Sequence, residues 1–143
     1  MRDNTLRGCT MGKLKRITFS KMTHWLDGTK RADDWPGYIG GDIPAGLAVS
    51  RVARLDDPTV NANGWTVSHI QSGYAVDRTP YLRTRKLAIE WAEALGKIAE
   101  RFAFSWDVDR GVLVDSMWRN GTYSDIHGEI DRSIRTIVEK SKN

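Results

Sequence analysis

The stretch GWTVSHIQSGYAVD, at residues 64–77, decides the fold together with LRTRKLAIEWAEALGKIAERF at residues 82–102. Side chains at residues 65–70 alternate along the chain, with Trp65, Val67 and His69 on one face, which is typical of a strand. The Ser72-Gly73 turn then leads to a short antiparallel partner over residues 74–77. We therefore predict a strand pair that runs directly into a helix.

A long amphipathic helix is predicted over residues 85–101. Its apolar side chains recur at the i, i+3 and i+4 spacing and form one stripe that is wide enough to cover a small sheet. Thr84 is a suitable N-cap residue because its hydroxyl can accept from a backbone N–H of the first turn. The stripe consists of Ala88, Trp91, Ala92, Leu95, Ile98, Ala99 and Phe102.

The preceding part of the chain predicts two more strands. Residues 13–22 alternate basic or polar residues with apolar ones, as an exposed or edge strand does, and residues 47–55 carry a second strand pattern. Residues 23–46 are rich in turn-forming residues and predict a long irregular connection. A loop of that length is uncommon in a compact domain, so it is either functional or contains another element.

The following part predicts a hairpin over residues 102–114, with a helix across residues 108–118 as the alternative. A second amphipathic helix is predicted over residues 122–141, where Thr122 and Asp125 form a capping-box-like start. The predicted fold class is thus α+β: a small antiparallel sheet covered by one long amphipathic helix, with a second helix at the C-terminus.

Length and composition favour one globular domain. The 143 residues are 40% hydrophobic and 28% charged, which excludes general disorder. We expect a flexible basic tail at residues 1–12 and a single domain over residues 13–143. The one cysteine allows no intramolecular disulfide, and no apolar run approaches the ~20 residues of a membrane span. We therefore expect a cytoplasmic protein without membrane association.

Positive charge is concentrated at the N-terminal end. The net charge is +4, yet residues 1–31 contain eight basic and two acidic residues, a local charge of +6. Such an end steers a protein toward nucleic acid or an acidic protein surface, although it is also compatible with a plainly solvated segment.

Cations also gather where the long helix starts, at Arg83, Arg85 and Lys86. A helix N-terminus carries partial positive charge and unpaired N–H groups, so these cations gain most when a phosphate binds. In the alternative interpretation they extend into water and Thr84 alone caps the helix. The predicted nucleic-acid-binding residues are Lys13, Lys15, Arg16, Arg51, Arg54, Arg78, Arg83, Arg85 and Lys86.

The order of strand, Ser72-Gly73 turn and helix over residues 65–92 resembles two DNA-binding modules. These are the arm-binding module of tyrosine recombinases and the plant ethylene-response-factor domain; the same order is similar to that of small phage proteins. Both modules lay a small sheet into DNA, so the resemblance implies contact with nucleic acid. This chain departs from them because residues 65–77 contain no lysine or arginine. Phosphate contact is then left to the flanking cations.

No catalytic or metal signature is present. His24, His69 and His127 lack metal-ligand spacing, and adjacent Ser68 and His69 would point to opposite faces of a strand. We expect His69 to be a partly buried, hydrogen-bonded side chain beside Trp65. The sequence thus predicts no enzyme, no cofactor and no metal.

The leading functional hypothesis is a small non-enzymatic binding protein of phage or mobile-element type that contacts nucleic acid or a nucleoprotein. The alternative is a protein-directed inhibitor of a host defence or regulatory complex, similar to an anti-CRISPR protein. It would act through an aromatic surface formed by Trp25, Trp35 and Tyr38. An enzyme with an unfamiliar site is a third possibility.

Overall fold

The computed structural model describes residues 13–24, 28–53, 61–76 and 82–141. The tail predicted at residues 1–12 lies outside the described residues. So do three of the predicted site residues, Trp25, Arg54 and Arg78.

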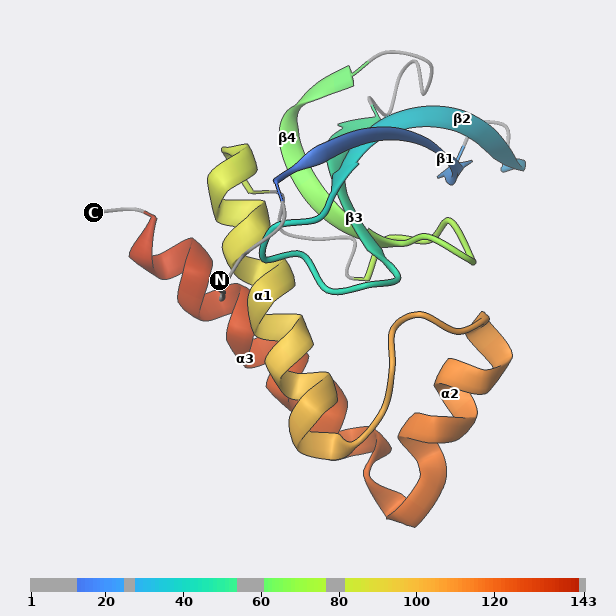
Figure 1. Cartoon of the computed structure of the whole chain (residues 1–143), viewed down its shortest axis with the longest axis vertical. Coiled ribbons are helices and arrows are strands. Elements are labelled where there is room, and N and C mark those ends of the chain that lie inside the picture. Colours follow the sequence, from blue (N-terminus) through green and yellow to red (C-terminus); the bar gives the residue numbers. More distant parts are fainter. Residues whose placement is uncertain (1–12, 25–27, 54–60, 77–81, 142–143) are drawn as a thin grey trace, which may run out of the picture.

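The protein combines a four-stranded antiparallel sheet with three helices (Figure 1). The strand order is β1-β2-β3-β4. The strands are β1 (Lys15–His24), β2 (Lys30–Ile39), β3 (Leu47–Ala53) and β4 (Asn61–His69). The helices are α1 (Arg85–Phe102), α2 (Arg110–Trp118) and α3 (Tyr123–Lys140), with a 3₁₀ turn at Arg119–Gly121. The α+β prediction is confirmed. Within the described segments, no helix has the length and apolar character needed to cross a membrane.

Strand β2 corrects the long irregular connection predicted over residues 23–46. It pairs with β1 along its whole length but with β3 only where Tyr38 lies opposite Val49. Because β2 and β3 are paired at this one position, β2 can contain Pro36, which has no N–H to donate. Pro36 and Gly37 read as turn residues in the sequence, although the long pairing with β1 keeps them in a strand.

Helix α2 corrects the hairpin predicted over residues 102–114 and agrees with the alternative helix. Asp109 caps it, since its carboxylate accepts from the N–H of Val112 at 3.0 Å. The aromatic alternation that suggests a strand has another cause. Ala103 ends α1 in the left-handed conformation, at φ 58°, and the following loop folds back so that Trp106 donates to the Leu95 carbonyl.

Two smaller expectations also change. The hydroxyl of Thr122 donates to the carbonyls of Met117 and Arg119, so the capping box predicted for α3 is wrong. The return strand predicted after Ser72-Gly73 is reduced to a single bridge between Ser68 and Ala75.

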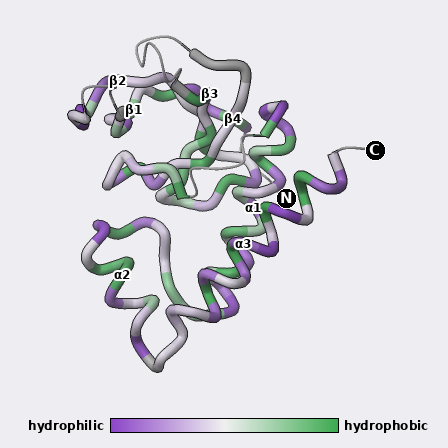
Figure 2. The backbone as a smooth tube through the Cα atoms, turned by 180° about the vertical axis from the view of Figure 1, so that it is seen from behind, coloured by the Kyte–Doolittle hydropathy of each residue, from purple (hydrophilic) through white to green (hydrophobic). Residues whose placement is uncertain are grey.

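Helix α1 covers one face of the sheet, and α3 packs along α1 (Figure 1). The core between them joins Val49 and Val67 of the sheet to Trp91 and Leu95 of α1. The apolar stripe predicted for α1 is therefore buried as expected, with Trp91 1% exposed. Figure 2 shows polar and apolar residues alternating along α1 and α3, as amphipathic helices require.

The sheet curls away from α1, so that its opposite face lies on the inside of the curl. We call this opposite face the inner face. The N–H of Met22 in β1 donates to the carbonyl of Gly73 after β4, at 2.9 Å, so the first strand meets the turn that follows the last. A Cβ on Gly73 would lie 2.5 Å from the Ser20 carbonyl oxygen. Close approach and a φ of +77° together favour glycine there. Phe19 and Trp35 form a small second core on this face.

Candidate nucleic-acid interface

The sheet register brings cations from distant parts of the sequence to the face that α1 covers. Arg16 of β1 lies opposite Tyr38 of β2, and Arg51 of β3 lies opposite Trp65 of β4. Directly opposed residues share a face of an antiparallel pair. Arg85, at the start of α1, reaches the same place. We call this set the cation–aromatic face: Arg16, Tyr38, Arg51, Trp65 and Arg85.

Two guanidinium groups of this face each lie against one of its two rings. The Arg85 Cζ atom lies 4.7 Å from the centroid of the Tyr38 ring, and the Arg51 Cζ atom lies 5.1 Å from that of Trp65. The two ring centroids are 6.3 Å apart. Each cation is thus within the ~6 Å over which a ring attracts it. The rings are half-buried, while the three arginines are exposed.

No carboxylate in the described part of the chain forms an ion pair with Arg16, Arg51 or Arg85. These arginines are therefore able to bind an external anion without first losing an internal partner.

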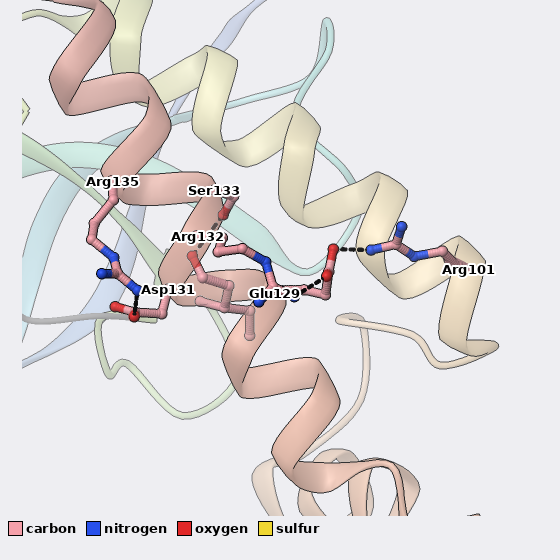
Figure 3. Close-up of polar contacts among 7 residues, drawn as sticks. Arg101, Glu129, Asp131, Arg132, Ser133 and Arg135 are labelled. Carbon is pink, nitrogen blue, oxygen red and sulfur yellow. Dashed lines mark hydrogen bonds and ion pairs between the residues drawn. The ribbon is translucent and has the colours of Figure 1, made fainter.

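Three arginines at the end of α1 and in α3 are engaged differently. Figure 3 shows Arg101 and Arg132 directed at Glu129, and Arg135 directed at Asp131. Hydrogen bonds from Arg132 and Arg101 hold the pKa of the Glu129 carboxyl below its ordinary value. The described part of the chain thus contains arginines that are ion-paired with neighbouring carboxylates in the helices and, on the cation–aromatic face, arginines without such a described partner.

The predicted cations at the helix start are only partly brought together. Thr84 caps α1 as predicted, accepting from the Leu87 N–H at 3.2 Å. Arg83 donates to the Ser141 carbonyl at 2.8 Å and is therefore drawn toward the end of α3. Lys86 is exposed in the first turn of α1.

The basic residues before and in β1 are also divided. Arg16 belongs to the cation–aromatic face, whereas Lys15 lies opposite Ile39 and so on the other face of the sheet. Lys13 is exposed and precedes the strand.

Trp35 and Tyr38, the two predicted protein-binding aromatic residues that the structure describes, do not form an exposed patch. Trp35 is 4% exposed on the inner face, where its indole N–H donates to the Arg51 carbonyl at 3.0 Å. It therefore positions the backbone of Arg51 instead of meeting a partner. Tyr38 is half-buried within the cation–aromatic face.

An exposed aromatic stack lies elsewhere, at the end of α2 and the start of α3. Trp118 is 59% exposed and stacks on Tyr123 with a centroid distance of 4.2 Å and an interplanar angle of 7°. The His127 ring is tilted by 38° to that of Tyr123, with a centroid distance of 4.2 Å. Sequence reasoning missed this stack because no local pattern indicates that Trp118, at the end of one helix, meets Tyr123, at the start of the next.

His69 is hydrogen-bonded, as predicted, and at 4% exposed it is more deeply buried than the predicted partly buried side chain. Its ring nitrogens contact the Ser72 hydroxyl at 2.8 Å and the Val108 carbonyl at 2.7 Å. Across residues 13–24, 28–53, 61–76 and 82–141, no three histidine, cysteine or acidic side chains gather as a metal site would require.

Comparisons with protein-family models, with curated proteins and with solved structures found no significant match. The resemblance to the recombinase arm-binding module therefore stays a prediction. What the chain binds has to be argued from its own surface.

Proposed function

We propose that the protein is a nucleic-acid-binding protein, of the phage or mobile-element type that its sequence resembles. The cation–aromatic face is the proposed binding surface. The observation that carries this proposal is the arrangement of Arg16, Arg51 and Arg85, from three different elements, around the rings of Tyr38 and Trp65.

Single-stranded nucleic acid fits this surface better than a duplex. Arginines supply phosphate contacts that do not depend on sequence, and aromatic rings supply stacking platforms for unpaired bases. Arginine and lysine make the commonest specific contacts in a duplex groove, whereas residues 65–77 carry neither.

Fluorescence anisotropy with a labelled single-stranded oligonucleotide and the matching duplex tests the proposal. Arg51→Gln/Arg85→Gln removes two charges from the face, and we expect affinity for the single strand to fall about tenfold or more at low salt. Arg132→Gln/Arg135→Gln removes the same charge from α3, where both arginines are ion-paired, and serves as the matched control. Equal losses in the two variants would mean that net charge alone controls binding.

A protein partner is the second candidate, and the exposed stack of Trp118 on Tyr123 favours it. Exposed tryptophans are frequent hot spots of protein interfaces. We expect Trp118→Ala to abolish capture of such a partner from nuclease-treated host lysate while oligonucleotide binding stays unchanged. Capture that persists in Trp118→Ala would argue against this surface.

A further inference from the structure

The turn after β4 contains a serine and a histidine in direct contact. His69 Nε2 lies 2.7 Å from the Val108 carbonyl oxygen, which can only accept a hydrogen bond. In the neutral imidazole, Nε2 therefore carries the proton and Nδ1 is the acceptor. Ser72 Oγ lies 2.8 Å from Nδ1, so the serine hydroxyl donates to the imidazole.

This order of groups matches what an activated serine requires. A nucleophile within hydrogen-bond reach of a base, and a third group that orients the base, is the general pattern. Here Val108 orients the imidazole, His69 is 4% exposed and Ser72 is half-buried. The N–H of Tyr74 also donates to Ser72 Oγ, at 3.2 Å, and stabilises negative charge on that oxygen.

Two cations flank the same turn. Lys30 Nζ, from β2, lies 5.8 Å from the centroid of the Tyr74 ring, and Arg110 Cζ, from the start of α2, lies 5.3 Å from it. The Tyr74 ring, two residues after Ser72, is thus contacted by cations from two segments far away in the sequence, while the Asp107 carboxylate accepts from Gln71 Nε2 of the same turn at 3.3 Å. The two cations outnumber this carboxylate, and their positive charge favours a substrate that carries negative charge.

We propose that Ser72 is a nucleophile, with His69 as its base, toward carboxylic esters whose acyl part bears an anionic group. This activity is independent of the nucleic-acid binding proposed above. Ser72 Oγ bonds to the carbonyl carbon while its proton passes to His69 Nδ1. The bond to the leaving alcohol then breaks, and the departing oxygen takes that proton. Water, deprotonated by His69, cleaves the acyl-serine, releasing the acid and restoring Ser72.

Ser72 also closes the turn, and that structural role alone predicts no chemical reactivity. A fluorophosphonate probe separates the two roles. Ser72 Oγ bonds to phosphorus, fluoride leaves and the proton passes to His69. We expect one label per chain on Ser72 in the folded protein, none in Ser72→Ala, and a rate about 100-fold lower in His69→Gln. Ser124→Ala, at an exposed serine of α3, is the matched control.

A second variant keeps the proposal testable where Ser72→Ala or His69→Gln unfolds the turn. In a chain with Cys9→Ser, Ser72→Cys supplies the only thiol. His69 should allow its alkylation by iodoacetamide at a pH well below the ~8.5 at which an ordinary thiol ionises. Adding His69→Gln should return the alkylation profile to that value.

The charge preference is measured with p-nitrophenyl hemisuccinate and p-nitrophenyl acetate. We expect the anionic ester to acylate the protein several-fold faster, and Arg110→Gln to remove that advantage. Three results would overturn the proposal: folded protein that is not labelled at Ser72, a Ser72→Cys thiol that titrates as an ordinary one, or equal rates with both esters.

Discussion

The two faces of the sheet are packed in different ways. Where α1 packs against it, one face of the sheet is apolar, with Val49 and Val67 against Trp91, all nearly inaccessible. The inner face contains Phe19 and Trp35, yet it also buries polar side chains. These are Lys21, Thr23, Ser50, Thr66 and Ser68.

Lys21 makes the contrast sharpest. It is 5% exposed, and its Nζ donates to Ser68 Oγ at 3.2 Å. Burial lowers the pKa of Lys21 to about 8, because the surroundings disfavour the charged form. Ser50 Oγ, buried on the same face, has no hydrogen-bond partner among the described residues. Burial of apolar side chains under α1 therefore stabilises the fold, while burial of polar side chains on the inner face lowers the free energy of unfolding.

Trp91→Ala should strongly destabilise the fold, because it empties part of the apolar core under α1. The side chain fills the core between α1, α3 and the sheet, and its indole N–H donates to Ser133 Oγ at 3.0 Å. We expect the free energy of unfolding to fall by about 3–5 kcal/mol, as large-to-small changes at buried aromatic residues do. Trp118→Ala, at a 59% exposed site, should lower it by less than ~0.5 kcal/mol. Urea denaturation of both variants measures the difference, and similar losses would contradict this packing.

Lys21→Met should act in the opposite direction. Methionine retains the length of the side chain and removes the buried charge, so we expect the free energy of unfolding at pH 7 to rise by about 2–3 kcal/mol. Lys86→Met, at an exposed position, should leave it nearly unchanged.

The pH dependence follows from the same burial. Since the folded pKa of Lys21 lies near 8 and the ordinary value is 10.5, the unfolded chain binds more protons between these pH values. The contribution of Lys21 to stability should therefore rise as pH increases through that window. Lys21→Met should lack this rise. Equal pH profiles for wild type and variant would show that Lys21 titrates normally in the fold.

Replacing two serines of the inner face should change the free energy of unfolding by smaller amounts. Ser68→Ala removes the hydroxyl that Lys21 contacts and should destabilise the fold by about 1–2 kcal/mol. Ser50→Ala removes a buried hydroxyl without a described partner and should be neutral or stabilise by up to ~1 kcal/mol. Thermal unfolding of both variants distinguishes them. A larger loss for Ser50→Ala would mean that its hydroxyl has a partner.

Local patterns predicted a large part of this fold. The stripe through Trp91 and Leu95 is long and regular, so α1 and its burial were predictable, as was the cap at Thr84. Strands β1, β3 and β4 also followed from alternation. Strand β2 was missed because Pro36 and Gly37 read as turn residues, while its pairing with β1 depends on contacts that are distant along the chain.

The candidate sites were harder to predict than the fold, because strand pairing between distant segments brings their residues together. Arg16, Arg51 and Arg85 were each predicted, yet only strand pairing reveals the rings between them. The burial of Lys21 was not predictable either, because its strand alternates as an exposed one would. Its surroundings come from β4 and from the curl of the sheet.

The salt dependence of single-strand binding tests the central claim most directly. Each phosphate contact contributes about 0.7 to the slope of log affinity against log salt concentration. The account predicts that Arg51→Gln/Arg85→Gln lowers the magnitude of that slope by about 1.4 relative to wild type, whereas Arg132→Gln/Arg135→Gln leaves it unchanged. Identical slopes for wild type and the Arg51/Arg85 variant, or no binding by wild type at low salt, would contradict it.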